Sequence, residues 1–473
     1  MPRMRVLPTL FGAVCLVQIA LANPFMSFGR QLQSERENRV VYVAAEAVRE
    51  NDKEEKDKKR ADLLFAWVGA DTGDHVAVID YSPQSDSYGS VISRHLLPSG
   101  SNRISTTGNE PHHIAITGDG QWLVTGGLTS FLKGTDEIFV WNIDQKTKKP
   151  SFAYSLDVPG YGCTDEFVSL DSQKLSFAVS MMCNSQGTSP GAIFRLHVPT
   201  GQLTLWQSAS VSLTAFNPHG FDINQNGLVS ADYIDPVSLF TTSFVFRDTL
   251  RHFNLDGTLN ATINMPTTNS GYMNFLFFPD AASSHLGVAC STLENVMYQV
   301  NARDNTVRPM LDLAAAITGG VRSLSVGLFH FGRTGNRMLM TFQLRYVVLI
   351  AIDPSRASAR VLQTFDFCAA HAQGQVSIDF PAMCAADGNH PGSHYIRIAA
   401  DEARFYLTNY FIVVGNAALP GTQSAHSFRI SKDAQGEFAS FDFEEQFAPD
   451  FQGGKPHGLV RGVWSGPEAF TLG

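Results

Sequence analysis

The feature that most constrains the fold of this chain is a short pattern that occurs four times. Each copy has a histidine followed by apolar residues at alternate positions, and the three longer copies continue into a polar turn. Apolar residues at alternate positions predict a β-strand, and the turn predicts a hairpin into a second strand. The histidines that open the copies are His112, His219, His394 and His457.

The spacing of the copies predicts the architecture. Successive histidines are 107, 175 and 63 residues apart, which corresponds to two, three and one units of roughly 60 residues, the length of a four-stranded propeller blade. The gaps contain similar strand starts at Glu166, at Asn274 and, more weakly, between Arg322 and Ser325. The sequence therefore predicts an all-β fold with a single seven-bladed β-propeller.

The chain before the propeller divides into two segments. Residues 1–22 carry Arg3, Arg5 and an apolar run from Leu7 to Leu21, which predicts a signal peptide and a secreted protein. Residues 23–60 are charged and end in a dibasic sequence, so they are a pro-segment or a solvated linker. Residues 61–473 then supply about 59 residues per blade, and no second domain is needed.

Charge restricts the partners of the protein. Without the first 60 residues the chain has 24 Lys and Arg against 36 Asp and Glu, a net charge of −12. An acidic chain without basic runs is a poor ligand for nucleic acid or anionic membranes. We expect neither as a partner, and expect a small apolar molecule as the substrate. The sequence gives no indication of the oligomeric state.

Cysteines and one sequon agree with secretion. Cys163 with Cys183, and Cys368 with Cys384, are close enough in sequence to close local loops as disulfides, which leaves Cys290 reduced in an apolar strand. Connectivity does not follow from sequence alone. The sequon at Asn260 predicts N-glycosylation.

The candidate site follows from the geometry of a propeller. The innermost strand of each blade starts at one end of the central channel, so the opening residue of each copy is expected to face the axis. This ring comprises His112, Glu166, His219, Asn274, Arg322 or Ser325, His394 and His457. Several imidazoles beside a carboxylate suit acid–base chemistry or metal binding. Near them in sequence, Asn274, Tyr233, Tyr272 and Tyr410 are predicted to orient a substrate, or simply to pack in the strands.

Three stretches resemble the selenium-binding protein and methanethiol oxidase family. They are GYMNFLFFPDAASSHLGVACSTLENVMYQV at residues 271–300, the C-terminal GSHYIRIAADEARFYLTNYF with GGKPHGLV, and EPHH at residues 110–113. The resemblance implies a seven-bladed propeller and a copper-dependent thiol oxidase with histidine ligands in the channel. His112 or His113, and His457, match the ligand pattern. The chain departs from the family at GYGCTDE, residues 160–166, which lacks a histidine, and in the additional His219 and His394.

A second resemblance concerns layout alone. The chain resembles the fungal hetero-Diels-Alderases of tropolone sesquiterpenoid biosynthesis in its layout: a predicted signal peptide, a single propeller, a glycosylation sequon and no recognisable cofactor motif. No site residue is carried over from this group.

These observations support three hypotheses. The first is a secreted fungal hetero-Diels-Alderase without a cofactor, which dehydrates its substrate to a quinone methide with His112, His219, His394, His457 and Glu166 as acid–base groups and adds a terpene. The second is a copper- or iron-dependent oxidase, with ligands among His112, His113, His219, His394 and His457. The third is a non-catalytic binding module. Stoichiometric copper or iron would favour the second hypothesis over the first.

Overall fold

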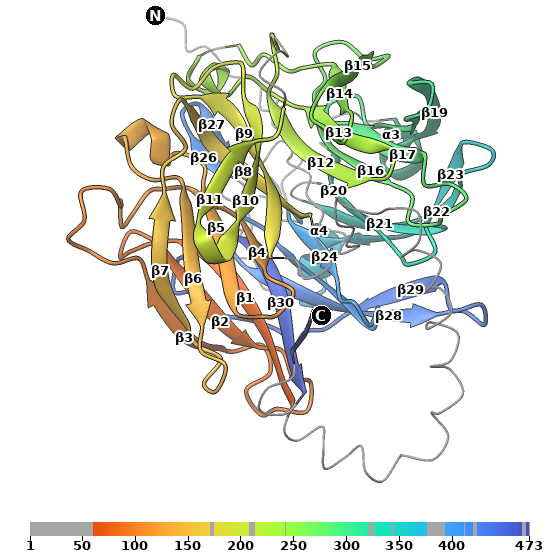
Figure 1. The fold of residues 1–473 in the computed structure, drawn as a ribbon. Coiled ribbons are helices and arrows are strands. Elements are labelled where there is room, and N and C mark those ends of the chain that lie inside the picture. The colour runs from red at the N-terminus through yellow and green to blue at the C-terminus, as the bar shows by residue number, and fades with distance from the viewer. Residues whose placement is uncertain are drawn as a thin grey trace, which may run out of the picture.

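The architecture is that of the predicted single seven-bladed β-propeller. A computed structural model describes residues 60–170, 175–207, 213–241, 243–320, 326–342, 345–375, 393–410, 412–419, 423–465 and 470–472. Within these residues, seven antiparallel sheets of four or five strands surround a central axis (Figure 1).

Blades 2 to 6 are each formed by four consecutive strands, with the first strand innermost. Blade 2 comprises β4 (Pro111–Ile116), β5 (Trp122–Gly127), β6 (Ile138–Ile143) and β7 (Pro150–Leu156), and blade 3 comprises β8 (Tyr161–Ser169), β9 (Ser176–Asn184), β10 (Ala192–His197) and β11 (Gln202–Leu205). Blade 4 comprises β12 (Pro218–Asn224), β13 (Gly227–Asp232), β14 (Thr249–Phe253) and β15 (Leu259–Asn264). Blade 5 comprises β16 (Tyr272–Phe277), β17 (Leu286–Ser291), β18 (Val296–Asn301) and β19 (Thr306–Asp312), and blade 6 comprises β20 (Val326–Phe331), β21 (Arg337–Phe342), β22 (Tyr346–Asp353) and β23 (Ser358–Asp366).

Blade 7 carries an insertion. Its sheet comprises β24 (Ile396–Ile398), β25 (Arg404–Thr408), β28 (Ala425–Lys432) and β29 (Phe438–Phe443). Between β25 and β28 the chain forms a separate two-stranded hairpin of β26 (Ile412–Val414) and β27 (Ala417–Leu419).

Blade 1 closes the ring with strands from both ends of the described chain. Its N-terminal strands are β1 (Arg60–Gly69), β2 (His75–Asp80) and β3 (Val91–Leu96), and its C-terminal strands are β30 (Lys455–Ser465) and β31 (Phe470–Leu472). The antiparallel pairing of β1 with β30 joins them into one sheet. Backbone hydrogen bonds between β1 and β30 therefore join the N-terminal and C-terminal strands, and this pairing closes the ring of blades.

Helices are few and short. The described residues contain α3 (Leu313–Thr318) and α4 (Phe367–Ala372), together with the 3-10 turns η3 (Ser130–Lys133), η4 (Val198–Thr200) and η5 (Pro236–Phe240). The side chain of Asp312 caps α3 by accepting a hydrogen bond from the backbone N–H of Ala315 at 3.0 Å. None of the described helices is sufficiently long and apolar to cross a membrane.

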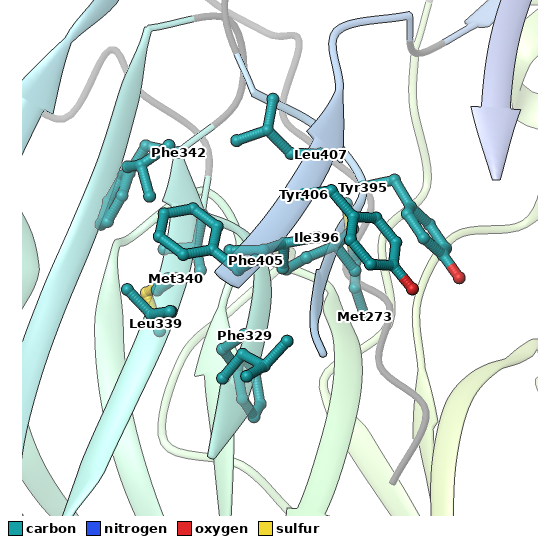
Figure 2. Packing of buried hydrophobic residues seen from close by; sticks show 14 of the residues in the cluster. Met273, Phe329, Leu339, Met340, Phe342, Tyr395, Ile396, Phe405, Tyr406 and Leu407 are labelled. Atoms are coloured by element: carbon teal, nitrogen blue, oxygen red, sulfur yellow. The ribbon is translucent and has the colours of Figure 1, made fainter. Parts of the chain in front are cut away.

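Apolar side chains fill the spaces between blades. Between blades 6 and 7, Phe329 and Met340 face Phe405 and Leu407 across the interface (Figure 2). Within blade 7 the rings of Phe405 and Phe428 stack with centroids 4.7 Å apart. Buried apolar area of this kind is the main stabilising term of the fold, and it holds the inner strands in a fixed ring.

The innermost strands share one irregularity that shapes the site. In six blades, the inner strand has one extra residue relative to the strand it pairs with: between two successive paired positions it advances by three residues while its partner advances by two. The extra residue lies near the start of the inner strand in every case. This is a β-bulge, which locally breaks the pairing and re-aims side chains. The first bulge residue is His112, Asp165, His219, Met273, Gly327 or His457, and the second is His113, Glu166, Gly220, Asn274, Leu328 or Gly458. In blade 7, His394 and Tyr395 occupy the equivalent places directly before β24.

Candidate axial metal centre

An aspartate lies at the centre of three histidines from two other blades. Asp165 Oδ1 is 3.1 Å from His112 Nε2 and 3.1 Å from His113 Nδ1, and Asp165 Oδ2 is 3.1 Å from His219 Nδ1. Each of these four side chains is at most 2% exposed. Bulges in blades 2, 3 and 4 therefore converge on one buried cluster.

Two further histidines extend the cluster. The ring centroids of His112 and His457 are 3.9 Å apart, and those of His113 and His457 are 5.4 Å apart. His457 Nε2 lies 2.9 Å from His394 Nε2. The predicted convergence of His112, His219, His394 and His457 is thus present in the fold, and His113 joins them.

Many polar atoms of the cluster lack a hydrogen bond. Within the described part of the chain, no partner is found for either ring nitrogen of His113, for His112 Nδ1, or for either oxygen of Asp165. The 3.1 Å approaches do not have hydrogen-bond angles. An unsatisfied buried polar atom costs about 1–3 kcal/mol, so a group of them in one place needs a physical reason.

The same atoms are close enough to share a ligand. Donor atoms of His112, His113 and His457 lie within 4.8 Å of one another, as do those of His112, Asp165 and His219. His112 belongs to both sets, so the two sets are adjacent. Imidazole nitrogen and carboxylate oxygen are the donors that copper, iron and zinc take in proteins.

Burial fixes the protonation of the histidines. It lowers the pKa of His112 to about 3 and that of His219 to about 4, although the nearby Asp165 opposes the shift at His219. It also lowers the pKa values of His113 and His394 well below the usual range. These imidazoles are therefore neutral near pH 7. Burial raises the pKa of Asp165 to about 7, which His219 partly offsets.

The predicted carboxylate of blade 3, Glu166, is not the one that contacts the histidines. It takes the second bulge position, where Oε1 accepts a hydrogen bond from the N–H of Phe167 at 3.1 Å. Burial and the neighbouring Asp165 raise the pKa of Glu166 well above its usual value. If the sequence TDEF of blade 3 is aligned with PHHI of blade 2, Asp165 takes the position equivalent to His112. The sequence analysis instead took Glu166 as the equivalent residue, which is an error of one position.

Asn274 and Gly327 mark the less polar side of the ring. Asn274 also takes a second bulge position, and its Oδ1 accepts a hydrogen bond from the N–H of Phe275 at 2.7 Å. Met273 and Gly327 take the first positions of blades 5 and 6. Arg322 and Ser325, which were predicted for blade 6, lie outside the described residues.

Two of the three predicted tyrosines lie next to the cluster. The ring of Tyr233 is 5.2 Å from that of His219, and the ring of Tyr410 is 6.1 Å from that of His457. The structure does not bring Tyr272 to the site. Its hydroxyl bonds Thr267 Oγ1 at 2.5 Å and its ring packs beside Tyr298 between strands of blades 4 and 5, because it precedes the bulge and points away from the axis.

The remaining predicted residues lie away from the axis or outside the described chain. Cys163 and Cys183 form the predicted disulfide between β8 and β9, and Cys290 is a buried free thiol. Cys368 is disulfide-bonded, while Cys384, its predicted partner, lies outside the described residues, as do residues 1–59. Asn260 is exposed on β15, and its glycosylation stays a prediction.

The fold and the cluster together define a class, namely a seven-bladed propeller with a buried histidine-rich site on its axis. No family model matches the sequence, and no curated protein is significantly similar to it. Among solved structures, a hypothetical selenium-binding protein from Sulfolobus tokodaii is similar at 13% identity, with 85% of this chain and 94% of that chain covered and a TM-score of 0.65. The periplasmic gluconolactonase of Pseudomonas aeruginosa is similar at 15% identity, with coverage of 85% and 98% and a TM-score of 0.50. These similarities show the fold, and they lend no support to the hetero-Diels-Alderase group.

Proposed function

We propose that this protein is a metalloenzyme in which the axial histidines hold copper or iron, and that it oxidises a small apolar molecule. One observation carries the proposal: in each of two adjacent sets, three imidazole or carboxylate donors from two or three blades lie within 4.8 Å of one another, and several of them lack a hydrogen-bond partner within the described chain. A metal ion would satisfy these donors and offset the cost of burying them.

The protonation of the histidines favours a role as metal ligands over a role as metal-free general acids. A general acid or base works best with a pKa near the working pH. His112 and His219 have pKa values of about 3 and about 4 because of burial, so neither holds a proton to donate near neutrality. A neutral imidazole is instead the form that binds a metal.

Each residue has a separate task in this proposal. His112, His113 and His457 form one donor set, and His112 with Asp165 and His219 form the other. Copper or iron in either set would supply one-electron chemistry with dioxygen as the acceptor. Asp165 adds negative charge beside a bound cation, and burial of the cluster excludes bulk water. Tyr233 and Tyr410 provide aromatic surface next to the donors, where an apolar molecule could pack.

Metal content measured by plasma mass spectrometry tests the proposal. The protein would be secreted from a eukaryotic host and purified without an affinity tag or a chelator. We expect about one copper or iron ion per chain, lost in His112→Ala, because His112 belongs to both donor sets. His197→Ala, at the end of β10 on the outer part of blade 3, is the matched control and should keep its metal.

A folded protein that contains no metal and binds neither copper nor iron on addition would contradict the proposal. The hetero-Diels-Alderase and binding-module hypotheses would then be tested directly, with tropolone and terpene substrates and with partner capture.

A further inference from the structure

The β26–β27 hairpin reaches from its own blade to the opposite side of the ring. It leaves blade 7 after β25 and is labelled β26 and β27 in Figure 1. Its tip contacts η5, which connects β13 and β14 of blade 4. The N–H of Asn416 donates to the carbonyl of Leu239 at 2.6 Å, and Asn416 Nδ2 donates to the carbonyl of Thr241 at 2.6 Å. A Cβ added at Gly415 would lie 2.5 Å from the Leu239 carbonyl oxygen, so the tip sits directly on this turn.

The base of the hairpin lies over the starts of the inner strands. The N–H of Val413 donates to Glu110 Oε1 at 3.2 Å, and Glu110 directly precedes β4 with His112. The Tyr410 hydroxyl donates to the same oxygen, and the Tyr410 ring neighbours that of His457. Ile412 and Val414, the two end residues of β26, are buried. The hairpin thus spans the end of the channel at which the histidine cluster lies.

The cluster is closed to solvent in this arrangement. His112, His219, His394 and His457 are each at most 1% exposed. A molecule that reacts there must therefore displace part of the structure. A two-stranded hairpin is only marginally stable by itself, and segments held by few contacts open at low cost. The blades, by contrast, are held by four-stranded sheets and apolar interfaces.

We infer that the β26–β27 hairpin is a lid, which swings off η5 to admit a small apolar molecule to the axial histidines. The chemistry of the seam indicates the class of molecule. Val413 on the lid is 41% exposed, and Val237, Phe240 and Val245, in and after the η5 turn that the lid tip contacts, are 38%, 46% and 42% exposed. An apolar rim at an opening favours uncharged, apolar ligands.

The lid is tested by locking it. Thr241→Cys with Asn416→Cys places two thiols where the Asn416 side chain meets the Thr241 backbone, and oxidation should cross-link the lid to η5. Metal-stripped protein is treated with diethyl pyrocarbonate, and modification of His112 and His457 is followed by mass spectrometry. The single Thr241→Cys variant, which cannot form the cross-link, is the control. His285, in the turn between β16 and β17, serves as the internal reference.

We expect the cross-linked protein to be modified at His112 and His457 at least tenfold more slowly than the control, with His285 unchanged. Asn416→Ala, which removes one lid contact, should be modified severalfold faster than the wild type. Equal rates with and without the cross-link would overturn the lid, because the reagent would then enter by another route. Absence of modification at the cluster in every folded variant would also overturn it. The lid rests on the proposed function in one respect, namely that the axial histidines are the reactive site. Because modification by diethyl pyrocarbonate is measured without a bound metal, the lid and the metal-dependent function can be contradicted independently.

Discussion

At the scale of single residues, Asp165 determines the character of the site. Its two oxygens approach imidazoles of His112, His113 and His219, so it is the carboxyl group around which the neutral histidines gather. Glu166, one residue further, faces a different environment and bonds its neighbouring backbone. The order of these two carboxyl groups is set by the bulge in β8, and it decides which of them could hold a metal.

Asp165→Asn tests that distinction. The amide keeps the size of the side chain and loses the charge, so we expect affinity for copper or iron to fall roughly 10- to 100-fold. Glu166→Gln is the matched control, and it should change affinity several times less. Competition titration against a chromophoric chelator measures both. An unchanged affinity in Asp165→Asn would remove the carboxylate from the ligand set.

At the scale of strands, the sequence predicted the inner-strand starts well in the copies that begin with histidine. Period-two alternation after His112, His219 and His457 located β4, β12 and β30, and the spacing predicted seven blades. The bulges were not predicted. A bulge changes the direction of only the two residues within it, and the alternation of apolar and polar residues in the rest of the strand stays the same. For the same reason Glu166 was predicted instead of Asp165, and the second row of residues, with His113, was recognised only through the family resemblance.

The glycines in the second bulge positions show why the inner strands pack so closely. A Cβ on Gly458 would lie 2.8 Å from the His112 carbonyl oxygen, and one on Gly220 would lie 2.7 Å from the Met273 carbonyl oxygen. Both contacts are to backbone of the next blade. Only a residue without a side chain lets adjacent inner strands approach to this distance.

Gly458→Ala is therefore expected to destabilise the fold by roughly 1–3 kcal/mol, since the inner strand of blade 1 must move away from blade 2. It should also weaken metal binding, because the shift moves His457 relative to His112. Denaturant unfolding and metal titration of the same preparation measure the two effects. A variant with wild-type stability would show that the contact is not a constraint.

A loop carboxyl group outside the axis gives a dependence on pH. Glu137 is 4% exposed beside a cleft of about 370 Å³, and its Oε2 accepts a hydrogen bond from the N–H of Val158 at 3.0 Å. Burial raises the pKa of Glu137 to about 8. Its contribution to stability is therefore complete below the pKa of the unfolded chain, about 4.5, and is lost as the pH rises through 8.

Glu137→Gln cannot ionise, so its stability relative to the wild type should increase with pH. We expect the difference in unfolding free energy to grow by about 1.4 kcal/mol per pH unit between pH 5 and 8. Urea unfolding at pH 5, 6.5 and 8 measures it, with Glu445→Gln on the exposed surface as the control. Parallel stability curves for the Glu137→Gln variant and the wild type would contradict the assigned pKa.

At the scale of the whole molecule, a buried ion pair accompanies the closure of the ring. Arg461 on β30 donates from Nε to Asp62 Oδ1 at 2.7 Å and from Nη2 to Asp62 Oδ2 at 2.5 Å, and Asp62 lies on β1. Both side chains are at most 8% exposed. Arg461 Nη1 also contacts Asp401 of blade 7 at 3.1 Å. The pair therefore connects the two ends of the described chain and the neighbouring blade.

Removing one partner should destabilise the closed ring strongly. Arg461→Ala leaves the Asp62 carboxylate buried without its cation, which typically costs about 3–5 kcal/mol. Arg356→Ala is the matched control, because Arg356 pairs with Asp353 at a side-chain exposure of 81% and should change stability by less than about 0.5 kcal/mol. The midpoint of urea unfolding measures both variants.

A further variant separates the charge from the packing. Arg461→Met with Asp62→Leu removes both charges and keeps apolar volume, so it should recover a large part of the stability that Arg461→Ala loses. Recovery would show that closure of the ring depends on the β1–β30 pairing and its apolar contacts. Each charge of the ion pair would then serve only to neutralise the other buried charge. If the double variant is as unstable as Arg461→Ala, the bidentate pair itself holds the two chain ends together.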